Sequence, residues 1–512
     1  MGDIKLKALT DNDTHLLFQW RNSSFIASLG TLQKKVEWDE HKEWVTRSIN
    51  SELRKVYIVL INDIPAGQIR FDKSSAHSIE CVISIYLIEA FTGKGFGVEV
   101  IECGCEAICS VWKDVVVINA FVLKNNILGQ KAFKRSGFAY EQKLCNEHHQ
   151  AFTYKTSTPI FHNKLFLDDQ EAIRVAEVVN SGFWAGGEKI TELEERLKEI
   201  SQRTHAVVVS SGLSAIRIAL LSLNISKGDE VVFPAYSCVA IVNAILSVNA
   251  IPVPVDIEPN TYNIDPIQVK SKITSNTKAI IAIHTFGMPA KIFELMEFNI
   301  PVIEDCAHAL GSISPNTKFG VHADVAVCSF YATKYIGGGE GGAILTNNNV
   351  IASAANDYRD YTDKKPSGFR LNEKNSDVHA ALTLCQIDKI SDIKYKRLRT
   401  VKQYNILLQP LLKKFPFFEI PNVTIEQAWY RYVLKFNKTS VLYVLNELKK
   451  ENVFAEIPVE RWQKEKELDY FPNTKLAFEY TLSLPLFISL NRTQQKIVVN
   501  SFQNILSKIY EK

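Results

Sequence analysis

The sequence predicts an α/β protein with a mixed α+β domain over residues 1–157 and a larger α/β/α domain over residues 161–512. The length is one reason, because 512 residues are too many for a single hydrophobic core. A second reason is the Thr-Ser-Thr-Pro segment at 156–159, where Pro159 ends regular strand pairing. Finally, apolar strands alternate with helices from 206 to 347, as a large, mostly parallel sheet requires.

Periodicity places the individual elements. In the first domain we expect strands at 56–61, 66–71, 79–87 and 115–121, and a helix at 99–112. In the second domain the pattern changes after Asn348, which predicts a small C-terminal α+β subdomain from about residue 385. Its expected elements are helices at 388–412 and 494–510 and strands at 430–436 and 453–458.

Composition argues against several classes of protein. The formal net charge is +3 and the charges are mixed along the chain, which predicts neither a nucleic-acid nor a membrane surface. Nine cysteines are scattered without a paired motif. Cys103, Cys105 and Cys109 share one helical stretch, where we expect packing rather than a metal cluster because neighbouring side chains point to different faces. Without a signal peptide or a membrane-length apolar run, we expect a cytoplasmic protein that holds no metal.

Lys334 stands between an apolar strand, 325–330, and a glycine-rich turn, 337–342. A lysine that forms a Schiff base with an aldehyde cofactor needs such a place, held away from bulk water so that its amine can lose its proton. The glycines allow backbone to pass close to a bound ligand. The alternative is a solvated lysine in an ordinary loop.

Two upstream segments favour the cofactor. The apolar run 301–305 ends in Glu304 and Asp305, and open α/β sheets bind ligands at the carboxyl ends of their strands. A carboxylate there can keep a pyridine nitrogen protonated. Residues 206–216 have the pattern of strand, small turn and helix, which presents backbone amides to a phosphate.

Together these segments resemble the DegT/StrS family of sugar-nucleotide aminotransferases over about 350 residues, from near Phe161 to the C-terminus. The resemblance implies a type I fold that binds pyridoxal 5′-phosphate (PLP). It also implies a homodimer with active sites at the subunit interface, and transfer of an amino group from glutamate to a keto-sugar nucleotide. The matching motifs are Ser211-Gly212-x-Ser214-Ala215, Gly228-Asp229-Glu230-Val231 with Pro234-Ala235-Tyr236, Asp256-Ile257 with Thr261-Tyr262-Asn263, Glu304-Asp305-x-x-His308, and Ser329-Phe330-x-x-Thr333-Lys334 with Gly339-Glu340-Gly341-Gly342.

The resemblance implies a role for each matched residue. Lys334 would form the Schiff base and later move the proton between substrate and cofactor. Asp305 would pair with the pyridine nitrogen, and His308 would reach the phenolic oxygen. The other cofactor-binding positions are Ser211, Gly212, Leu213 and Ser329 at the phosphate, Cys238 at the ring, and Asn372 at the phosphate across the dimer interface. The alternatives are a helix N-cap for Asp305 and a core histidine for His308.

Three positions depart from the family pattern. Leu213 replaces a common threonine, which removes a hydroxyl that Ser214 could supply instead. Cys238 replaces an aromatic residue that often stacks on the cofactor ring, and Lys374 replaces an arginine. Related dehydratases have histidine in place of the Schiff-base lysine, so Lys334 favours transamination.

The first domain contains a strand, a glycine turn and a helix around residues 92–98, a geometry that gathers amides around a phosphate. The alternative is a plain tight connection. With the strand 115–121 and the segment 125–138, the ensemble resembles the GNAT N-acetyltransferase superfamily. The resemblance implies that acetyl-CoA lies along Asn126 and that its pyrophosphate is held by the amides of Gly93, Lys94, Gly95, Phe96, Gly97 and Val98.

This domain departs from the superfamily at Thr92, which replaces arginine or glutamine, and at Phe133, which replaces the tyrosine often used as general acid. We expect Glu80 to act as the base, directly or through water, although a plain surface glutamate is the alternative. Trp20, Arg21, Asn22 and the segment 38–44 are expected on the acceptor side; the alternative is that their aromatic residues are core.

These expectations combine into a bifunctional enzyme. A PLP-dependent aminotransferase would aminate a keto-6-deoxyhexose nucleotide, with the 4-keto form favoured, and an acetyl-CoA-dependent acetyltransferase would then cap the new amine. One alternative gives the acetyltransferase an unrelated acceptor, such as a peptide N-terminus. Another makes the protein a PLP-bound sensor of sugar nucleotides, although no basic stripe suggests DNA binding.

Overall fold

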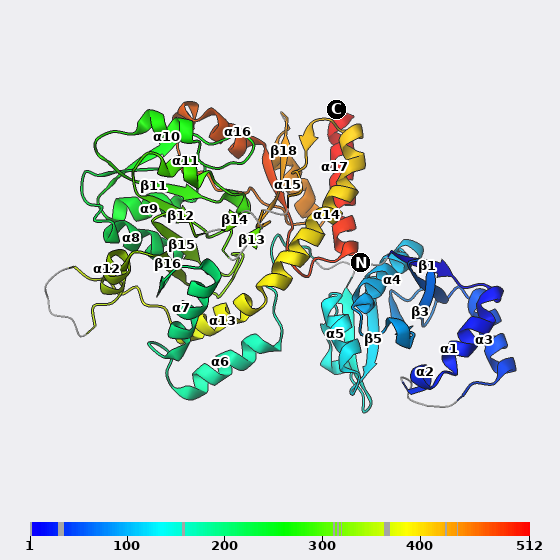
Figure 1. Cartoon of the computed structure of the whole chain (residues 1–512). Coiled ribbons are helices and arrows are strands. Elements are labelled where there is room, and N and C mark those ends of the chain that lie inside the picture. Colours follow the sequence, from blue (N-terminus) through cyan, green and yellow to red (C-terminus); the bar gives the residue numbers. More distant parts are fainter. Residues whose placement is uncertain are drawn as a thin grey trace. The chain divides into compact units, whose positions relative to one another are not determined.

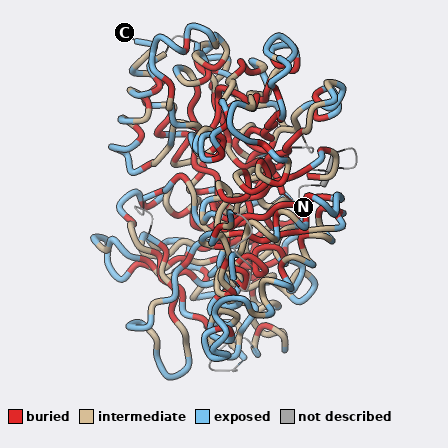
Figure 2. Tube along the Cα trace, turned by 90° about the vertical axis from the view of Figure 1, so that its left-hand side faces the viewer, coloured by how far each residue is buried: buried red, intermediate tan, exposed pale blue. Residues whose placement is uncertain are grey.

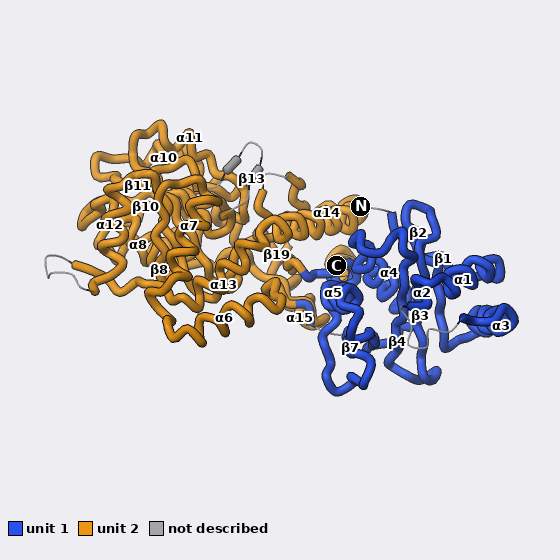
Figure 3. The backbone as a smooth tube through the Cα atoms, turned by 60° about the horizontal axis from the view of Figure 1, so that its bottom comes forward, with its two compact units in different colours: residues 1–160, 489–498 blue, residues 161–488, 499–512 orange. Residues whose placement is uncertain are grey.

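The computed structural model describes residues 3–28, 35–155, 159–310, 313–314, 317–318, 320–362, 369–424, 427–437 and 439–511. Residues 156–158 of the expected linker lie outside this set. The chain divides into two compact units (Figure 3). Helix α17 (Arg492–Tyr510) begins in the first unit and ends in the second. Unit 1 is Met1–Ile160 with Ser489–Val498, and unit 2 is Phe161–Ile488 with Val499–Lys512. Among the described helices, none is both long enough and apolar enough to cross a membrane.

Unit 1 is built on a sheet in the order β1-β2-β3-β4-β5-β7-β6. All neighbours are antiparallel except β4 and β5, which run parallel and are paired only from Glu80 with Val117 to Ile83 with Ala120. The two strands part beyond that point, because Ser84–Leu87 pairs with β3 alone. The strands are β1 (Ile4–Ala8), β2 (Arg54–Ile61), β3 (Ile64–Lys73), β4 (Glu80–Leu87), β5 (Val117–Leu123), β6 (Ala139–Tyr140) and β7 (His149–Lys155).

Helices cover both faces of this sheet (Figure 1). Neighbouring side chains of β2 enter two different cores, as expected when a strand alternates its side chains between faces. Val56 and Ile58 pack with α1 and α3, while Val59 and Ile61 belong to the core that α4 and α5 complete. The helices are α1 (Thr14–Arg21), α2 (Ser24–Ser28), α3 (Trp38–Ile49), α4 (Phe96–Val111) and α5 (Ile127–Arg135), with 3₁₀ turns at Asp11–Asp13, Glu89–Phe91 and Gln142–Leu144.

Unit 2 contains the predicted large sheet, in the order β10-β9-β11-β12-β15-β16-β8. Its strands point the same way except β16, which is antiparallel to both neighbours. The two prolines of β10 are accommodated because that strand lies at the sheet edge. The strands are β8 (His205–Val209), β9 (Glu230–Pro234), β10 (Ile251–Val255), β11 (Thr277–Ile283), β12 (Val302–Asp305), β15 (Val325–Ser329) and β16 (Gly342–Thr346). Separately, β13 (Ile313–Ser314) pairs antiparallel with β14 (Thr317–Lys318).

Two helical layers enclose the sheet of unit 2, so that the buried strands run through the interior (Figures 1 and 2). Val207 and Val209 of β8 enter the core under α8, α9 and α12, whereas Ala206 and Val208 face α7 and α13. The helices are α6 (Asp169–Ser181), α7 (Glu188–Ser201), α8 (Gly212–Ser222), α9 (Val239–Ser247), α10 (Pro266–Lys272), α11 (Ile292–Met296), α12 (Asn349–Arg359) and α13 (Asp377–Asp388), with a 3₁₀ turn at Thr285–Gly287.

The remaining elements form a smaller α+β region around an antiparallel sheet, β17-β18-β19. The expected strand at 453–458 is wrong, because the segment contains only isolated bridge residues, Val453 and Glu456, and Glu456 bridges to Ser483. The elements are α14 (Ile390–Lys414), β17 (Phe418–Glu419), β18 (Tyr432–Phe436), α15 (Val441–Lys450), α16 (Pro472–Tyr480), β19 (Thr481–Leu484) and α17, with a 3₁₀ turn at Glu465–Tyr470.

A substitution at Gly342 tests how closely the central strands of unit 2 are packed, because this residue begins β16, which lies between β15 and β8. A Cβ atom at Gly342 would lie 2.3 Å from the Ser211 carbonyl oxygen and 2.9 Å from that of Cys328. We expect Gly342→Ala to destabilise unit 2 by about 1–3 kcal/mol, since two backbone segments must move. Calorimetry of the unit 2 transition measures this. Gly97→Ala, where the nearest atom is 3.7 Å away, is the control, and equal stability of both variants would contradict the packing.

Candidate active site

Lys334 lies in the turn that joins β15 to β16. The turn is fixed by its own backbone, since the Phe330 amide donates to the Gly341 carbonyl at 2.8 Å and the Lys334 amide donates to the Tyr331 carbonyl at 2.8 Å. The half-buried Lys334 side chain ends with Nζ 3.3 Å from His308 Nε2. The same amine lies 5.5 Å from the centre of the Tyr430 ring. The amine is therefore held among other side chains of the site.

Asp305 is the last residue of β12 and is buried. One of its carboxylate oxygens accepts a hydrogen bond from the Ala307 amide at 2.9 Å. Burial raises the pKa of Asp305, although the positive charge of Lys334 opposes the shift. The carboxylate lies at the carboxyl end of a parallel strand, where α/β sheets place ligand-binding groups.

His308 follows three residues later and is stacked on Tyr430, with ring centres 4.2 Å apart and planes 14° apart. The Phe286 amide donates to His308 Nδ1 at 3.3 Å, so the proton of the neutral ring lies on Nε2, which faces Lys334 and can donate to its amine when that amine is uncharged. Burial, and then the nearby charge of Lys334, lower the pKa of His308 well below its ordinary value. A neutral His308 can therefore donate a hydrogen bond from Nε2.

The N-terminus of α8 lies against the end of β15. Gly212 is the first residue of the helix, and the Ser211 hydroxyl caps it by accepting from the Ser214 amide at 3.1 Å. A Cβ atom at Gly212 would lie 2.8 Å from Ser329 Cβ and 3.0 Å from Ser329 Oγ. The missing side chain thus brings a hydroxyl next to free helix amides, which forms a cradle suited to a phosphate.

These groups fit PLP in kind and number. Lys334 offers an amine to an aldehyde, buried Asp305 offers a carboxylate to a ring nitrogen, and His308 offers a ring N–H to a phenolic oxygen. The cradle of Gly212 and Ser329 would be filled by any larger side chain at 212. The fit rests on contacts within unit 2 alone.

The other predicted PLP positions, Leu213, Cys238 and Asn372, have different surroundings in the single chain. The Leu213 side chain is partly buried and packs against the hydrophobic core. Cys238 is exposed at the N-cap of α9. Asn372 is exposed and forms an isolated bridge with Asp360, while Lys374 donates to Asp360 at 2.7 Å. A single chain thus leaves Asn372 directed to the surface.

Tyr430 is a site residue that the sequence analysis missed. Burial by itself would raise the pKa of Tyr430, but the positive charges of Lys334 and Arg431 and a hydrogen bond with Thr333 lower it overall. Arg397 holds this segment by donating to the Tyr430 carbonyl at 3.1 Å. Residue 430 lies almost 100 positions from Lys334, and no local pattern marks it as part of the site.

In unit 1 the predicted glycine turn leads directly into α4. Gly93 has φ 76° and Gly95 has φ 87°, both in the left-handed region that favours glycine, and neither would meet an atom within 4 Å if it carried a Cβ. Phe96, Gly97 and Val98 form the first turn of α4, and Lys94 is exposed between the two glycines. The turn follows the strand β4 just after it has parted from β5.

The other candidates of unit 1 lie on β4, β5 and the helices. Glu80 is exposed at the start of β4, where its carboxylate accepts from Asn119 Nδ2 at 3.0 Å. Asn126 caps α5 by accepting from the Gly129 amide at 2.9 Å. Phe133 is buried between Phe138 and Phe152.

Some of the residues that we expected on the acceptor side of the acetyltransferase site pack into the interior of unit 1. Trp20 meets the Tyr86 ring edge-on at 6.4 Å, and both Trp20 and Trp44 pack against the smaller core of unit 1. Asn22 exchanges two hydrogen bonds with the Val36 backbone. Arg21 lies close enough to Tyr86 for its charge to oppose the rise that burial causes in the pKa of Tyr86.

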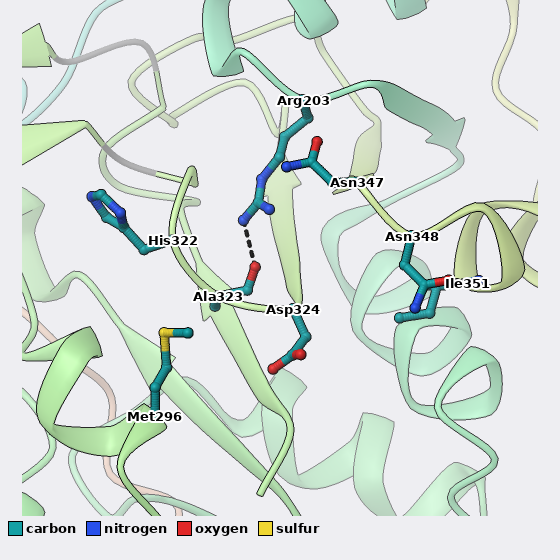
Figure 4. Close-up of a pocket in the computed structure, with 8 residues that line it drawn as sticks. All are labelled: Arg203, Met296, His322, Ala323, Asp324, Asn347, Asn348 and Ile351. Carbon is teal, nitrogen blue, oxygen red and sulfur yellow. Dashed lines mark hydrogen bonds between the residues drawn. The ribbon is translucent and has the colours of Figure 1, made fainter. Parts of the chain in front are cut away.

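A separate cavity of about 450 Å³ lies at the opposite end of the strands of the unit 2 sheet, where β8 and β15 begin (Figure 4). The Arg203 guanidinium is bonded to the Gly320 carbonyl at 2.7 Å and to the Ala323 carbonyl at 2.5 Å. None of the predicted site residues lines this cavity. Its lining is Arg203, Met296, His322, Ala323, Asp324, Asn347, Asn348 and Ile351.

Comparison with solved structures shows the fold of unit 2. NtdA from Bacillus subtilis, solved with bound pyridoxamine phosphate (PMP), is 26% identical with a TM-score of 0.61, covering 66% of this chain and 82% of NtdA. PseC from Helicobacter pylori is 24% identical with a TM-score of 0.62, covering 69% of this chain and all of PseC. The PLP form of Spr1654 from Streptococcus pneumoniae is 23% identical with a TM-score of 0.63, covering 69% of this chain and 99% of Spr1654.

Sequence comparison finds a similar protein and a matching family model. An uncharacterized protein of Methanocaldococcus jannaschii, MJ1066, is 28% identical over 380 residues, which is 67% of this chain and 96% of that protein. The model of the DegT/DnrJ/EryC1/StrS aminotransferase family matches residues 166–503. This match covers most of the chain and confirms the predicted family of the second domain, with a mixed α/β fold consistent with a type I PLP-transferase. The chain therefore belongs to the DegT/DnrJ/EryC1/StrS aminotransferase family.

Proposed function

We propose that this protein is a bifunctional enzyme: a PLP-dependent sugar-nucleotide aminotransferase in unit 2 and an acetyl-CoA-dependent N-acetyltransferase in unit 1. The observation that carries the first activity is the juxtaposition of Lys334, His308 and Asp305 at one end of the sheet. Solved family members contain PLP or PMP, which supports PLP as the cofactor.

When bound, PLP would supply a protonated pyridine ring that withdraws electrons from the substrate carbon. Asp305 would hold the proton on the ring nitrogen, and Lys334 would bind the aldehyde and then carry a proton at Nζ. His308 would donate from Nε2 to the phenolic oxygen. The phosphate would be held by Ser211, Gly212, Leu213 and Ser329, with Cys238 beside the ring.

The proposed substrates are glutamate as amino donor and a keto-6-deoxyhexose nucleotide, with the 4-keto form favoured. PseC, which shares the fold, is an aminotransferase of pseudoaminic acid biosynthesis, and this supports a sugar substrate. Sugar chemistry also agrees with the motif resemblance that runs through unit 2.

A homodimer would complete the proposed site, since Asn372 would reach the phosphate of a second copy. Its segment is exposed in the single chain. Large apolar side chains near it in sequence are exposed as well, with Phe369 at 60% and Tyr361 at 58%, and Trp184 at 58% lies in the loop after α6. Burial of such side chains would favour association.

The acetyltransferase proposal rests on the place where β4 and β5 part. Beyond Ile83 the edge of β4 that faced β5 has no strand partner, so its backbone groups can pair with the amides of a pantetheine arm. The glycine turn at Gly93 and Gly95 lies at the end of that opening and would receive the pyrophosphate. Asn126 would lie along the arm, and Glu80 would act as base.

The two activities are chemically consecutive. Transamination creates a primary amine, and an N-acetyltransferase consumes one. The expected end product is an N-acetylated amino sugar nucleotide. The alternative is that the acetyltransferase acts on an amine unrelated to the sugar.

Lys334→Ala should leave a folded protein without the visible absorbance of a lysine-bound cofactor, because Lys334 is the only lysine among the described residues whose amine lies beside His308. Spectroscopy of the protein reconstituted with PLP measures this. Lys396→Ala, which removes a lysine stacked on Phe166, is the control and should keep the absorbance. An undiminished absorbance band in Lys334→Ala would show that another residue binds the cofactor.

Asp305→Asn should still bind PLP but nearly abolish transamination, since an amide cannot hold the pyridinium proton. Glutamate-dependent formation of 2-oxoglutarate measures the loss. Activity within a few-fold of the parent would mean that the essential carboxylate lies elsewhere.

Gly95→Val should block acetylation and leave transamination intact. The left-handed backbone at Gly95 disfavours valine by about 1–3 kcal/mol, and the new side chain would occupy space needed by the pyrophosphate. With glutamate, a keto-sugar nucleotide and acetyl-CoA, the variant should accumulate the free amino sugar by mass spectrometry.

The parent protein supplies the control for this experiment and should yield the N-acetylated sugar. If the parent aminates the sugar but never acetylates it, the unrelated acceptor replaces the proposed two-step order. Loss of both activities in a folded Gly95→Val protein would contradict the independence of the two units.

A further inference from the structure

Glu373 reaches the N-terminus of α8 from a distant segment of the chain. Its backbone carbonyl accepts from the Ser210 amide at 2.8 Å, and its own amide donates to the Arg359 carbonyl at 2.9 Å. Its carboxylate Oε2 accepts from Ser210 Oγ at 2.5 Å and from Ser214 Oγ at 2.6 Å. Neither backbone nor side chain of Glu373 is therefore free to leave this helix end.

The hydroxyl protons at this helix end can be assigned one by one. A serine hydroxyl carries a single proton, and a carboxylate can only accept. Ser210 and Ser214 therefore both give their protons to Glu373. Ser211 Oγ lies 2.8 Å from Ser214 Oγ and must be the donor of that pair, because the Ser214 proton is already used.

This assignment leaves few donors for a phosphate. Ser214 is 3% exposed and its proton points away from any ligand, while Leu213 has no hydroxyl and packs on the core. A phosphate would be held by helix amides, by Ser329, and by Ser211 only if that hydroxyl turns. Ser214 does not supply the hydroxyl that Leu213 lacks.

Glu373 also places a negative charge behind the phosphate cradle. Among the residues that the structure describes, the cation paired with it at this helix end is Arg217, whose Nη1 lies 3.9 Å from Oε1 and whose guanidinium faces the Phe369 ring at 5.8 Å. That separation makes a loose pair, so the carboxylate charge is only partly offset. Like charges at short range in a partly buried site repel.

We propose that Glu373 is a positioning residue that weakens the hold of the cradle on the cofactor phosphate, by keeping the Ser214 proton and by adding a negative charge. The proposal rests on the proposed function, since it assumes that the cradle of Gly212 and Ser329 holds the cofactor phosphate. It matters most for the amine form of the cofactor, PMP, because that form has no covalent bond to Lys334. Glu373 would thus set how readily PMP leaves the protein.

The test is an equilibrium titration of the cofactor-free protein with PMP, followed by fluorescence, and in parallel with pyridoxamine, which lacks the phosphate. Glu373→Gln keeps the size and one accepting oxygen but removes the charge. We expect its Kd for PMP to fall at least five-fold while its Kd for pyridoxamine stays within two-fold of the parent. Glu199→Gln, an equal charge change on α7, should change neither.

Ser214→Ala tests the proton assignment. In the parent background it should leave the Kd for PMP within two-fold, because the Ser214 proton is not available to a ligand. In a Glu373→Ala background the freed hydroxyl can turn to the phosphate, so adding Ser214→Ala should reverse part of the gain. A Ser214→Ala variant that weakens PMP binding ten-fold in the parent background would overturn the assignment.

Ser329→Ala separates this proposal from the cradle itself. If Ser329→Ala weakens PMP binding but Glu373→Gln leaves it unchanged or weaker, the cradle stands and the role of Glu373 is refuted. If Ser329→Ala has no effect on PMP binding, the cradle is misplaced and the inference about Glu373 falls with it.

Discussion

Close contact between three backbone segments, 210–212, 328–330 and 341–342, is the constraint on which the aminotransferase site depends. Gly212 lets α8 begin against Ser329, and Gly342 lets β16 pass between two carbonyl groups without a side chain. Because these segments touch, the amides of α8 and the Ser329 hydroxyl lie together at the carboxyl end of β15. The turn that carries Lys334 follows β15 directly. The chemistry of the site is thus set by where side chains are absent.

Two adjacent carboxylates of β12 then divide into a structural and a chemical role. Glu304 is surrounded by donors: His284 Nε2 at 2.9 Å and the Gly320 amide at 2.7 Å. Burial alone would raise the pKa of Glu304, but these donors lower it overall. Asp305 has one amide donor, and burial raises its pKa. Neighbouring residues of a strand face opposite sides, so adjacent acids meet different surroundings.

Electrostatics links the residues around Lys334 into one unit. Its charge lowers the pKa of His308 and of Tyr430, and the two rings stack on each other. These three residues therefore affect one another, and a substitution of Tyr430 would change the surroundings of both His308 and Lys334. In unit 1 the proposed binding site for acetyl-CoA depends mainly on backbone instead, because it consists of the unpaired edge of β4 and of glycines with positive φ.

The sequence by itself determined the elements and the family of unit 2, because strand alternation, glycine turns and motif spacing are local properties of the chain. It placed β15, α14 and α17 close to their observed bounds. Only the tertiary structure brought Tyr430 to His308 and Glu373 to Ser214, and it left 453–458 with isolated bridges at Val453 and Glu456 instead of a strand. Such contacts join residues far apart in sequence, and they are decided by packing, which no local pattern records.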